Sequence, residues 1–212
     1  MRALRYTLLS DGGSERALLH VLTWLLRENL SQCAIDSSWA DLRRLPHPPS
    51  NLSDRICRTL ELYPCDLLFV HRDAERASPE SRLAEIADAL KKARSRIDLP
   101  PAVCVVPVRM QEAWLLFDVQ AIRKAAGNPN GRAVLNLPRV GDLETKPNPK
   151  KLLNELLCRA SELKGRHLKR FKRSIAPARV AEFIDDFGPL RDLCAFKKLE
   201  DDIKEIVASG GW

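Results

Sequence analysis

Residues 65–75 read CDLLFVHRDAE, a nearly continuous apolar run of strand length that is followed directly by an Asp-x-Glu pair. A strand that is apolar on both faces is typical of a parallel sheet covered by helices on both sides. The acids that follow the run, Asp73 and Glu75, stand where this buried strand would end. Because ligands of open α/β sheets bind at the carboxyl ends of the strands, the stretch predicts both the fold class and the position of a site.

Three further apolar runs of strand length surround this one in the chain, at residues 5–10, 33–39 and 102–108. Amphipathic segments separate the runs, and Ser53 is a plausible cap for the second of the helices that they predict. We expect these helices from Ser14 onward and at residues 52–62, 79–96 and 111–126. The alternation favours an α/β fold with a mostly parallel four-stranded sheet flanked by helices.

The character of the chain changes after residue 126. Residues 127–150 are rich in Pro, Gly and Asn, which predicts an irregular linker. Beyond the linker we expect helices near residues 150–163, 177–187 and 197–208. The chain is therefore divided into an α/β domain over residues 1–126 and a second part over residues 127–212, which consists of the linker and a helical, basic C-terminal region packed on that domain.

The formal net charge of +7 and the isoelectric point near 9.3 are moderate, so the placement of the charge matters more than its size. Six Lys or Arg residues fall within residues 164–173, with His167 and Phe171 between them. Such a segment is able to bind a phosphate backbone with little sequence preference. A solvated helix face or a flexible loop is the other interpretation of the same pattern.

The cysteines and the apolar runs bear on the compartment of the protein. None of the six cysteines forms a C-x2-C pair or has a histidine at zinc-ligand spacing. The N-terminal apolar stretch is too short for a signal peptide, and no run approaches the length of a membrane span. We expect a protein of the reducing cytoplasm with no membrane partner.

Acidic residues follow three of the four predicted strands. Asp11 ends the first run with Glu15 one helical turn beyond it, Asp73 and Glu75 follow the third, and Glu112 follows the fourth. A sheet edge that collects these carboxylates is electrostatically costly unless a cation neutralises them, and Mg²⁺ or Mn²⁺ prefers such oxygen ligands. Taken singly, the same residues are also compatible with a helix-capping turn, solvated loop acids and a favourable helix-dipole contact.

Three segments carry a resemblance to a known family: SDGGSER at residues 10–16, FVHRDAE at 69–75 and VRMQEAWLL at 108–116. They resemble the TOPRIM fold of topoisomerases, primases and small nucleases, and more closely the bacterial domain-of-unknown-function 4276 family, over about residues 5–118. The resemblance implies a TOPRIM/Rossmann-like sheet. The chain differs from the family pattern at two positions. Asp11 stands where the family usually has glutamate, and Glu75 stands where it usually has aspartate.

By this resemblance Asp73 and Glu75 hold the metal with help from Asp11. Glu15 or Glu112 completes the metal site, lies behind it or serves as general base, so the expected catalytic set is all five acids. Further residues are expected to bind the phosphates of a nucleic acid: Arg72, Arg76, Arg109, Lys150, Lys164, Arg166, Lys169, Arg170, Lys172 and Arg173.

Missing features narrow the function to hydrolysis. Only Tyr6 and Tyr63 are present, neither placed like the nucleophile of a topoisomerase, and no Walker A loop or G-x-G-x-x-G motif occurs. The sequence thus predicts a metal-dependent nuclease acting on DNA or RNA. The resemblance further implies an effector of anti-phage defence that works beside an ABC- or SMC-type ATPase.

Two alternatives come from other functional classes. The chain is compatible with a non-catalytic subunit that binds nucleic acid or an ATPase and carries a degenerate TOPRIM site. A phosphoacceptor domain is disfavoured, because that class needs a second acid beside the first aspartate and a lysine after a fifth strand, and the sequence has neither.

Overall fold

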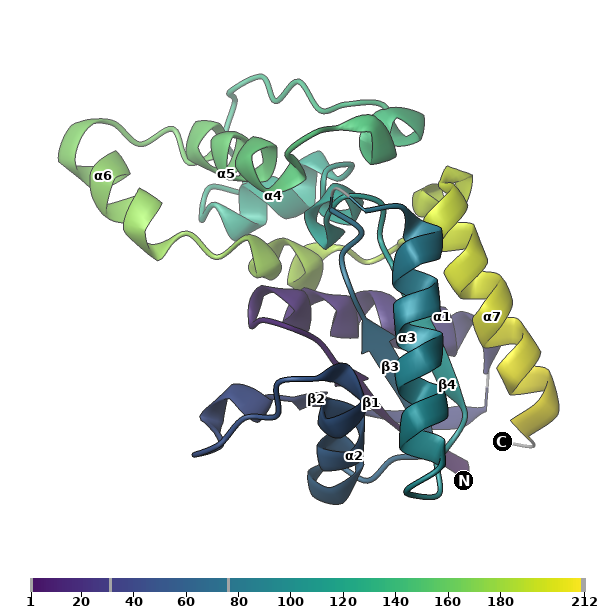
Figure 1. The fold of residues 1–212 in the computed structure, drawn as a ribbon. Helices are drawn as coiled ribbons and strands as arrows, with labels where there is room; N and C mark the ends of the chain where they lie inside the picture. The colour runs from purple at the N-terminus through teal and green to yellow at the C-terminus, as the bar shows by residue number, and fades with distance from the viewer. Residues whose placement is uncertain (1, 31, 76, 211–212) are drawn as a thin grey trace.

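The computed structural model describes residues 2–30, 32–75 and 77–210 (Figure 1). Its centre is an all-parallel sheet of four strands in the order β2-β1-β3-β4. The strands are β1 (Arg2–Leu9), β2 (Cys33–Ala40), β3 (Leu67–His71) and β4 (Ala102–Val105). Helices flank the sheet, so the predicted α/β class and the four-stranded parallel sheet are confirmed, with a strand order that is consistent with a Rossmann-like fold.

The register of the sheet brings the carboxyl ends of its central strands to one edge. Leu9 pairs with Val70, and His71 pairs with Val105. Backbone hydrogen bonds continue beyond β3, because Ala74 N donates to Pro107 O at 3.1 Å and Glu75 N to Arg109 O at 2.8 Å. The segments that follow β1, β3 and β4 therefore leave the sheet side by side.

Alternate side chains of each strand enter two separate hydrophobic cores. Tyr6, Phe69 and Val103 belong to the larger core, which also contains residues of α1 (Leu18–Asn29) and α7 (Cys194–Gly210). Tyr6 and Phe69 meet edge to face there, with 5.3 Å between ring centroids. Leu68 and Val70 point to the smaller core, on the opposite face of the sheet.

The smaller core is covered by α2 (Leu52–Leu62) and α3 (Pro79–Arg94), which lie together in front of the sheet in Figure 1. The helix predicted over residues 52–62 has the expected bounds, but its predicted cap was wrong. Asn51 is the cap, because its side-chain oxygen accepts a hydrogen bond from Asp54 N at 2.8 Å. Ser53 instead donates its hydroxyl to the same Asn51 oxygen at 2.9 Å.

The single helix predicted over residues 111–126 was also wrong. The segment consists of a 3-10 helix, η3 (Gln111–Leu115), and a separate α-helix, α4 (Val119–Ala125). The break follows from Asp118, whose carboxylate accepts a hydrogen bond from Ala121 N at 2.9 Å and starts a new helix. Trp114 becomes fully buried in the larger core by this arrangement.

The C-terminal part contains α5 (Pro149–Ala160), α6 (Gly165–Ser174) and α7, whose residues 194–210 extend the predicted helix. The α-helix predicted over residues 177–187 was wrong. A 3-10 helix, η5 (Pro177–Phe183), lies there instead, and a second one, η6 (Gly188–Asp192), follows the predicted range.

Short 3-10 turns complete the chain: η1 (Ser14–Ala17) before α1, η2 (Leu42–Arg44) after β2 and η4 (Val140–Thr145) before α5. The larger core joins residues on both sides of position 126, including Leu153 of α5 and Val180 of η5. Within the described residues, no helix combines the length and the apolar character that a membrane span requires.

The central position of Phe69 gives a test of this architecture. Phe69 is completely buried in β3, so Phe69→Ala removes a large side chain from the larger core. We expect the free energy of unfolding to fall by about 3–5 kcal/mol, measured by urea denaturation. Val134 is 72% exposed, and Val134→Ala is the control that leaves the stability unchanged. A loss below about 1 kcal/mol for Phe69→Ala would contradict this position of the strand.

Candidate functional site

The turn after β1 is shaped by a close contact between Gly12 and Glu15. A Cβ atom at Gly12 would lie 2.8 Å from Glu15 Oε2, so a larger residue there requires the glutamate to move. Ser14 donates its hydroxyl to Glu15 Oε1 at 2.9 Å. Glu15 Oε2 is buried and has no hydrogen-bond partner, which leaves one carboxylate oxygen of the turn available for a ligand.

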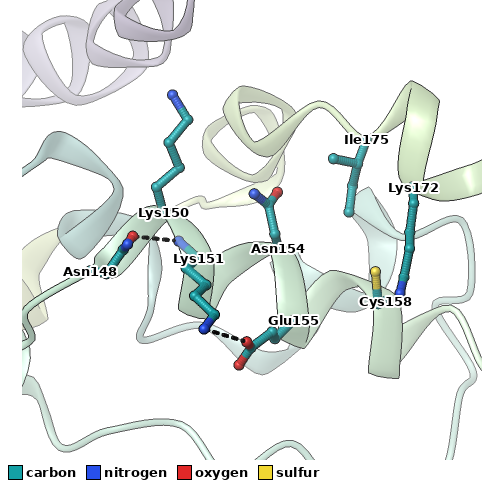
Figure 2. Close-up of a pocket in the computed structure, with 8 residues that line it drawn as sticks. All are labelled: Asn148, Lys150, Lys151, Asn154, Glu155, Cys158, Lys172 and Ile175. Atoms are coloured by element: carbon teal, nitrogen blue, oxygen red, sulfur yellow. Dashed lines mark hydrogen bonds and ion pairs between the residues drawn. The ribbon is translucent and has the colours of Figure 1, made fainter.

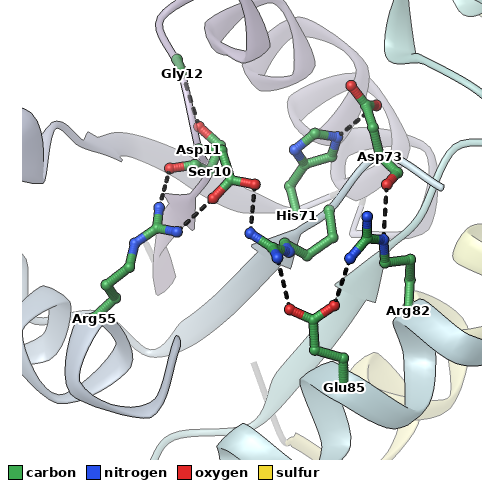
Figure 3. Close-up of polar contacts among 9 residues, drawn as sticks. Ser10, Asp11, Gly12, Arg55, His71, Asp73, Arg82 and Glu85 are labelled. Carbon is green, nitrogen blue, oxygen red and sulfur yellow. Dashed lines mark hydrogen bonds and ion pairs between the residues drawn. The ribbon is translucent and has the colours of Figure 1, made fainter. Parts of the chain in front are cut away.

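Asp11 is held by two arginines (Figure 3). Arg55 of α2 pairs with one carboxylate oxygen, and Arg72 Nη1 lies 2.6 Å from the other. Burial alone would raise the pKa of the Asp11 carboxyl. The hydrogen bond from Arg55 and the positive charges of Arg55 and Arg72 outweigh that effect and keep the pKa below its usual value. Asp11 is therefore a charge-balanced group rather than an open ligand.

The arginine pair extends into a network that the sequence did not indicate. Arg72 Nη2 lies 2.6 Å from Glu85 Oε1, and Arg82 Nη1 lies 2.8 Å from Glu85 Oε2. Arg82 Nε also donates to the backbone oxygen of Asp73 at 3.2 Å. Arg55, Arg82 and Glu85 were missed because they lie on the polar sides of α2 and α3, where charged residues are ordinary.

Asp73 faces away from this network. Its Oδ1 accepts a hydrogen bond from Gln111 N at 3.0 Å and lies 3.2 Å from His71 Nε2. His71 is only 2% exposed, and its Nδ1 has no partner. The last residue of β3 and the first residue of η3 thus fix the Asp73 carboxylate, which was a predicted ligand.

Glu112 is the most deeply buried acid at this edge, with 3% of its surface exposed. Burial raises the pKa of its carboxyl, and the negative charges of Asp73 and Glu15 act in the same direction. Lys150 of α5 opposes the shift, with its Nζ 3.7 Å from Glu112 Oε1. Asp73 and Glu15 are therefore near enough for their charges to act on Glu112.

Glu75 and Arg109 form the exposed rim of the edge. Both have left-handed backbones, with φ of +51° and +69°, a conformation that costs a non-glycine residue on the order of 1–3 kcal/mol. Arg109 Nη1 donates to the Glu75 backbone oxygen at 3.2 Å. The Glu75 side chain is exposed and shares no described contact with the other acids.

The predicted ligand set Asp11, Asp73 and Glu75 is not brought together. Among residues 2–30, 32–75 and 77–210, no three His, Cys, Asp or Glu side chains lie close enough to hold a metal ion as they stand. Glu15, Asp73 and Glu112 offer the carboxylate oxygens that a hard cation prefers. Asp73 and Glu15 act on the charge of Glu112, and Glu15 Oε2 is buried without a hydrogen-bond partner. Because these side chains do not form such a group as they stand, a cation at this edge would need them to move closer together.

Some of the predicted phosphate-binding residues have a polar partner and others have none. Arg72 pairs with Asp11 and Glu85, Arg109 donates to a backbone oxygen, and Lys150 pairs with Glu112. Arg76 lies outside the described residues. The remaining residues are exposed and form no ion pair within the described part of the chain: Lys164, Arg166, Lys169, Arg170, Lys172 and Arg173. The basic segment is thus a helix, α6, that keeps its positive charge unbalanced.

The raised pKa of Glu112 makes a prediction about pH. Between its usual pKa near 4.5 and the higher value in the folded state, the folded protein binds more protons than the unfolded chain. Stability therefore falls as pH rises through that window, and Glu112→Gln removes the fall. In urea denaturation with EDTA, the variant should gain more stability over wild type at pH 7.5 than at pH 4.

Glu80 supplies the control of opposite sign. Hydrogen bonds from its own backbone N–H and from Ser78 at the start of α3 hold the pKa of Glu80 below its usual value. Its contribution to stability is therefore present at pH 7.5 and is lost as pH falls through the folded pKa. Glu80→Gln should lose stability at pH 7.5 relative to pH 4. An equal effect of Glu112→Gln at both pH values would show that its carboxyl is not perturbed.

Comparisons of the chain with protein-family models, with curated proteins and with solved structures found no match. The resemblance to the TOPRIM fold and to the domain-of-unknown-function 4276 family therefore stays a prediction.

Proposed function

We propose that this chain is a Mg²⁺- or Mn²⁺-dependent phosphodiester hydrolase, a nuclease that acts on DNA or RNA. One observation carries the proposal. The buried carboxylate of Glu112 lies at the carboxyl edge of the sheet, where the charges of Asp73 and Glu15 act on it, and Lys150 connects this acidic group to the basic helical region. An acidic edge beside a cationic helix is the charge pattern of an enzyme that needs a cation to approach a phosphate backbone.

In this proposal Glu15, Asp73 and Glu112 are the residues that hold the cation. When bound, a divalent cation polarises a phosphoryl oxygen and lowers the pKa of a bound water. His71 and Gln111 fix the orientation of the Asp73 carboxylate through the hydrogen bonds described above. This assignment replaces Asp11 and Glu75 of the expected ligand set with Glu15 and Glu112.

The surrounding cations have separate roles. Arg55 and Arg72 neutralise Asp11 and so reduce the negative charge that an approaching phosphate meets. Lys150 lies between Glu112 and the open surface, where it is able to contact a phosphate once a metal takes over the neutralisation of Glu112. Arg109 on the rim is exposed and adds a second contact of the same kind.

We also propose a cellular compartment and a biological role for the activity. All six cysteines are free, which suits action in a reducing cytoplasm. From the family resemblance alone, we propose that the enzyme is the effector of an anti-phage defence system and has an ABC- or SMC-type ATPase as its partner.

A second candidate function is a nucleic-acid- or ATPase-binding subunit without catalysis. The specific observation that favours it is that Asp11 is neutralised by two arginines while Glu75 is exposed, so neither acid of the expected set is an open ligand. In this case α6 still binds the nucleic acid or the ATPase, and the acidic residues catalyse no reaction.

Cleavage of mixed substrates separates the two candidates. Wild type incubated with plasmid, single-stranded DNA and total tRNA should cut at least one of them with Mg²⁺ or Mn²⁺ and none of them with EDTA. Asp73→Asn and Glu112→Gln should each lower the rate about 100-fold or more, because they remove a proposed ligand. The matched control is Asp88→Asn, an exposed acid of α3 that pairs with Lys92.

The metal itself is tested without reference to activity. A cation that binds only the folded protein stabilises it by RT ln(1 + [L]/Kd) and so raises its melting temperature as the cation concentration increases. Mg²⁺ or Mn²⁺ should therefore raise the melting temperature of wild type and of Asp88→Asn, and should not raise that of Asp73→Asn or Glu112→Gln. The same rise in all four proteins would place the bound cation elsewhere.

Cleavage that persists in EDTA, or that is unchanged in both site variants, would overturn the nuclease proposal. The second candidate would be established by a different result. Wild type and Asp73→Asn would bind nucleic acid with equal affinity, and wild type would cut no substrate with or without a candidate ATPase.

A further inference from the structure

A groove with a volume of about 560 Å³ opens between α5 and α6, in a part of the molecule that the acidic edge does not occupy (Figure 2). Figure 2 shows Lys172 and Ile175 reaching from α6 and the chain that follows it toward α5, and Asn154 pointing from α5 toward them. We call this the α5–α6 groove. Its residues that matter here are Lys150, Lys151, Asn154, Cys158, Lys172 and Ile175.

The charge of the α5–α6 groove favours an anionic ligand. Three lysines line it together with one acid, Glu155, which lies 4.0 Å from Lys151 and neutralises it in part. Lys172 has no ion pair in the described part of the chain, and the neighbouring cations of α6 are likewise unbalanced. A polyanion would release counterions from this surface when it binds.

The walls of the α5–α6 groove suit a flat ring better than a phosphate alone. Cys158 and Ile175 are partly buried and apolar, and the aliphatic stems of the lysines extend that surface. Asn154 Oδ1 is buried and has no hydrogen-bond partner. An amide in this position offers an acceptor and two donors to the hydrogen-bonding edge of a nucleobase.

One residue, Lys150, connects the α5–α6 groove to the acidic edge. Lys150 lines its end, and the Nζ of the same residue lies 3.7 Å from Glu112 Oε1. A strand whose base enters the groove would therefore pass its backbone close to Glu112. No rearrangement of α5 is needed for this connection, because one side chain belongs to both places.

We propose that the α5–α6 groove binds one unpaired nucleobase of a single-stranded nucleic acid, with the flanking phosphates on Lys150, Lys151 and Lys172. The base edge that Asn154 would read is already used in a duplex, so a paired base must first be extruded at a cost in free energy. This assignment deepens the proposed function, because it names a single-stranded nucleic acid as the substrate. It rests on the proposed function only in taking a nucleic acid as the ligand.

Binding in EDTA tests the preference for single strands without any cleavage. The fluorescence anisotropy of a labelled single-stranded oligonucleotide should give tighter binding than a duplex of the same sequence. Asn154→Ala should weaken single-strand binding about fivefold, the usual worth of a hydrogen bond, and leave duplex binding unchanged. Lys172→Ala should reduce the slope of log affinity against log salt by about one, whereas Lys91→Ala on the exposed side of α3 should not.

Cys158 provides a direct probe of occupancy, and Cys194 is its internal control. Cys158 lines the α5–α6 groove, whereas Cys194 is exposed at the start of α7 and does not line it. At an oligonucleotide concentration ten times the Kd, alkylation of Cys158 should slow about tenfold, because only the unoccupied protein reacts. The alkylation rate of Cys194 should stay constant.

The binding and alkylation results decide on the groove independently of whether the protein cuts nucleic acid. Unprotected Cys158 at saturation, or equal weakening of single-strand and duplex binding by Asn154→Ala, overturns the α5–α6 groove even if the protein cuts nucleic acid. Protection of Cys158 with unchanged Cys194 supports the groove even if no substrate is cut.

Discussion

The pairing of β1 with β3 and of β3 with β4 is the constraint on which the rest of the molecule depends. Because all strands are parallel, the segments after Leu9, His71 and Val105 emerge at one edge. Each of these segments carries acids, so the fold itself gathers negative charge there. Burial of Tyr6 and Phe69 against each other secures the register, and the register decides which carboxylates become neighbours.

The charge at that edge is divided into two unlike halves. Asp11 is balanced by Arg55 and Arg72, and its pKa is lowered despite its partial burial. Burial raises the pKa of the Glu112 carboxyl, the charges of Asp73 and Glu15 act in the same direction, and Lys150 offsets the shift only in part. A divalent cation would gain most from the second half, where like charges already repel one another.

Periodicity was sufficient to predict the sheet and most of its helices. The runs around β3 and α2 were recovered because both elements have strong and unambiguous patterns. The helix at residues 111–126 failed because apolar residues at helical spacing gave no sign of the break at Asp118. Side-chain choices such as Asn51 over Ser53 as cap depend on contacts that spacing does not encode.

The site was predicted less completely than the fold. The sequence placed the acids after strands that end at one edge of the sheet, but it did not separate the neutralised Asp11 and the exposed Glu75 from Glu15, Asp73 and Glu112. That separation depends on Arg55 of α2 and Lys150 of α5, which are 44 and 38 residues away in the chain from Asp11 and Glu112 (55 − 11 and 150 − 112). Pairings over such distances have no local signal.

Crystals grown with Mn²⁺ would test the central claim most directly, because anomalous scattering locates the metal without assuming any activity. The account predicts an anomalous peak between the carboxylates of Glu15, Asp73 and Glu112. A peak on Asp11 and Glu75, or no peak at the carboxyl edge of the sheet, would contradict it.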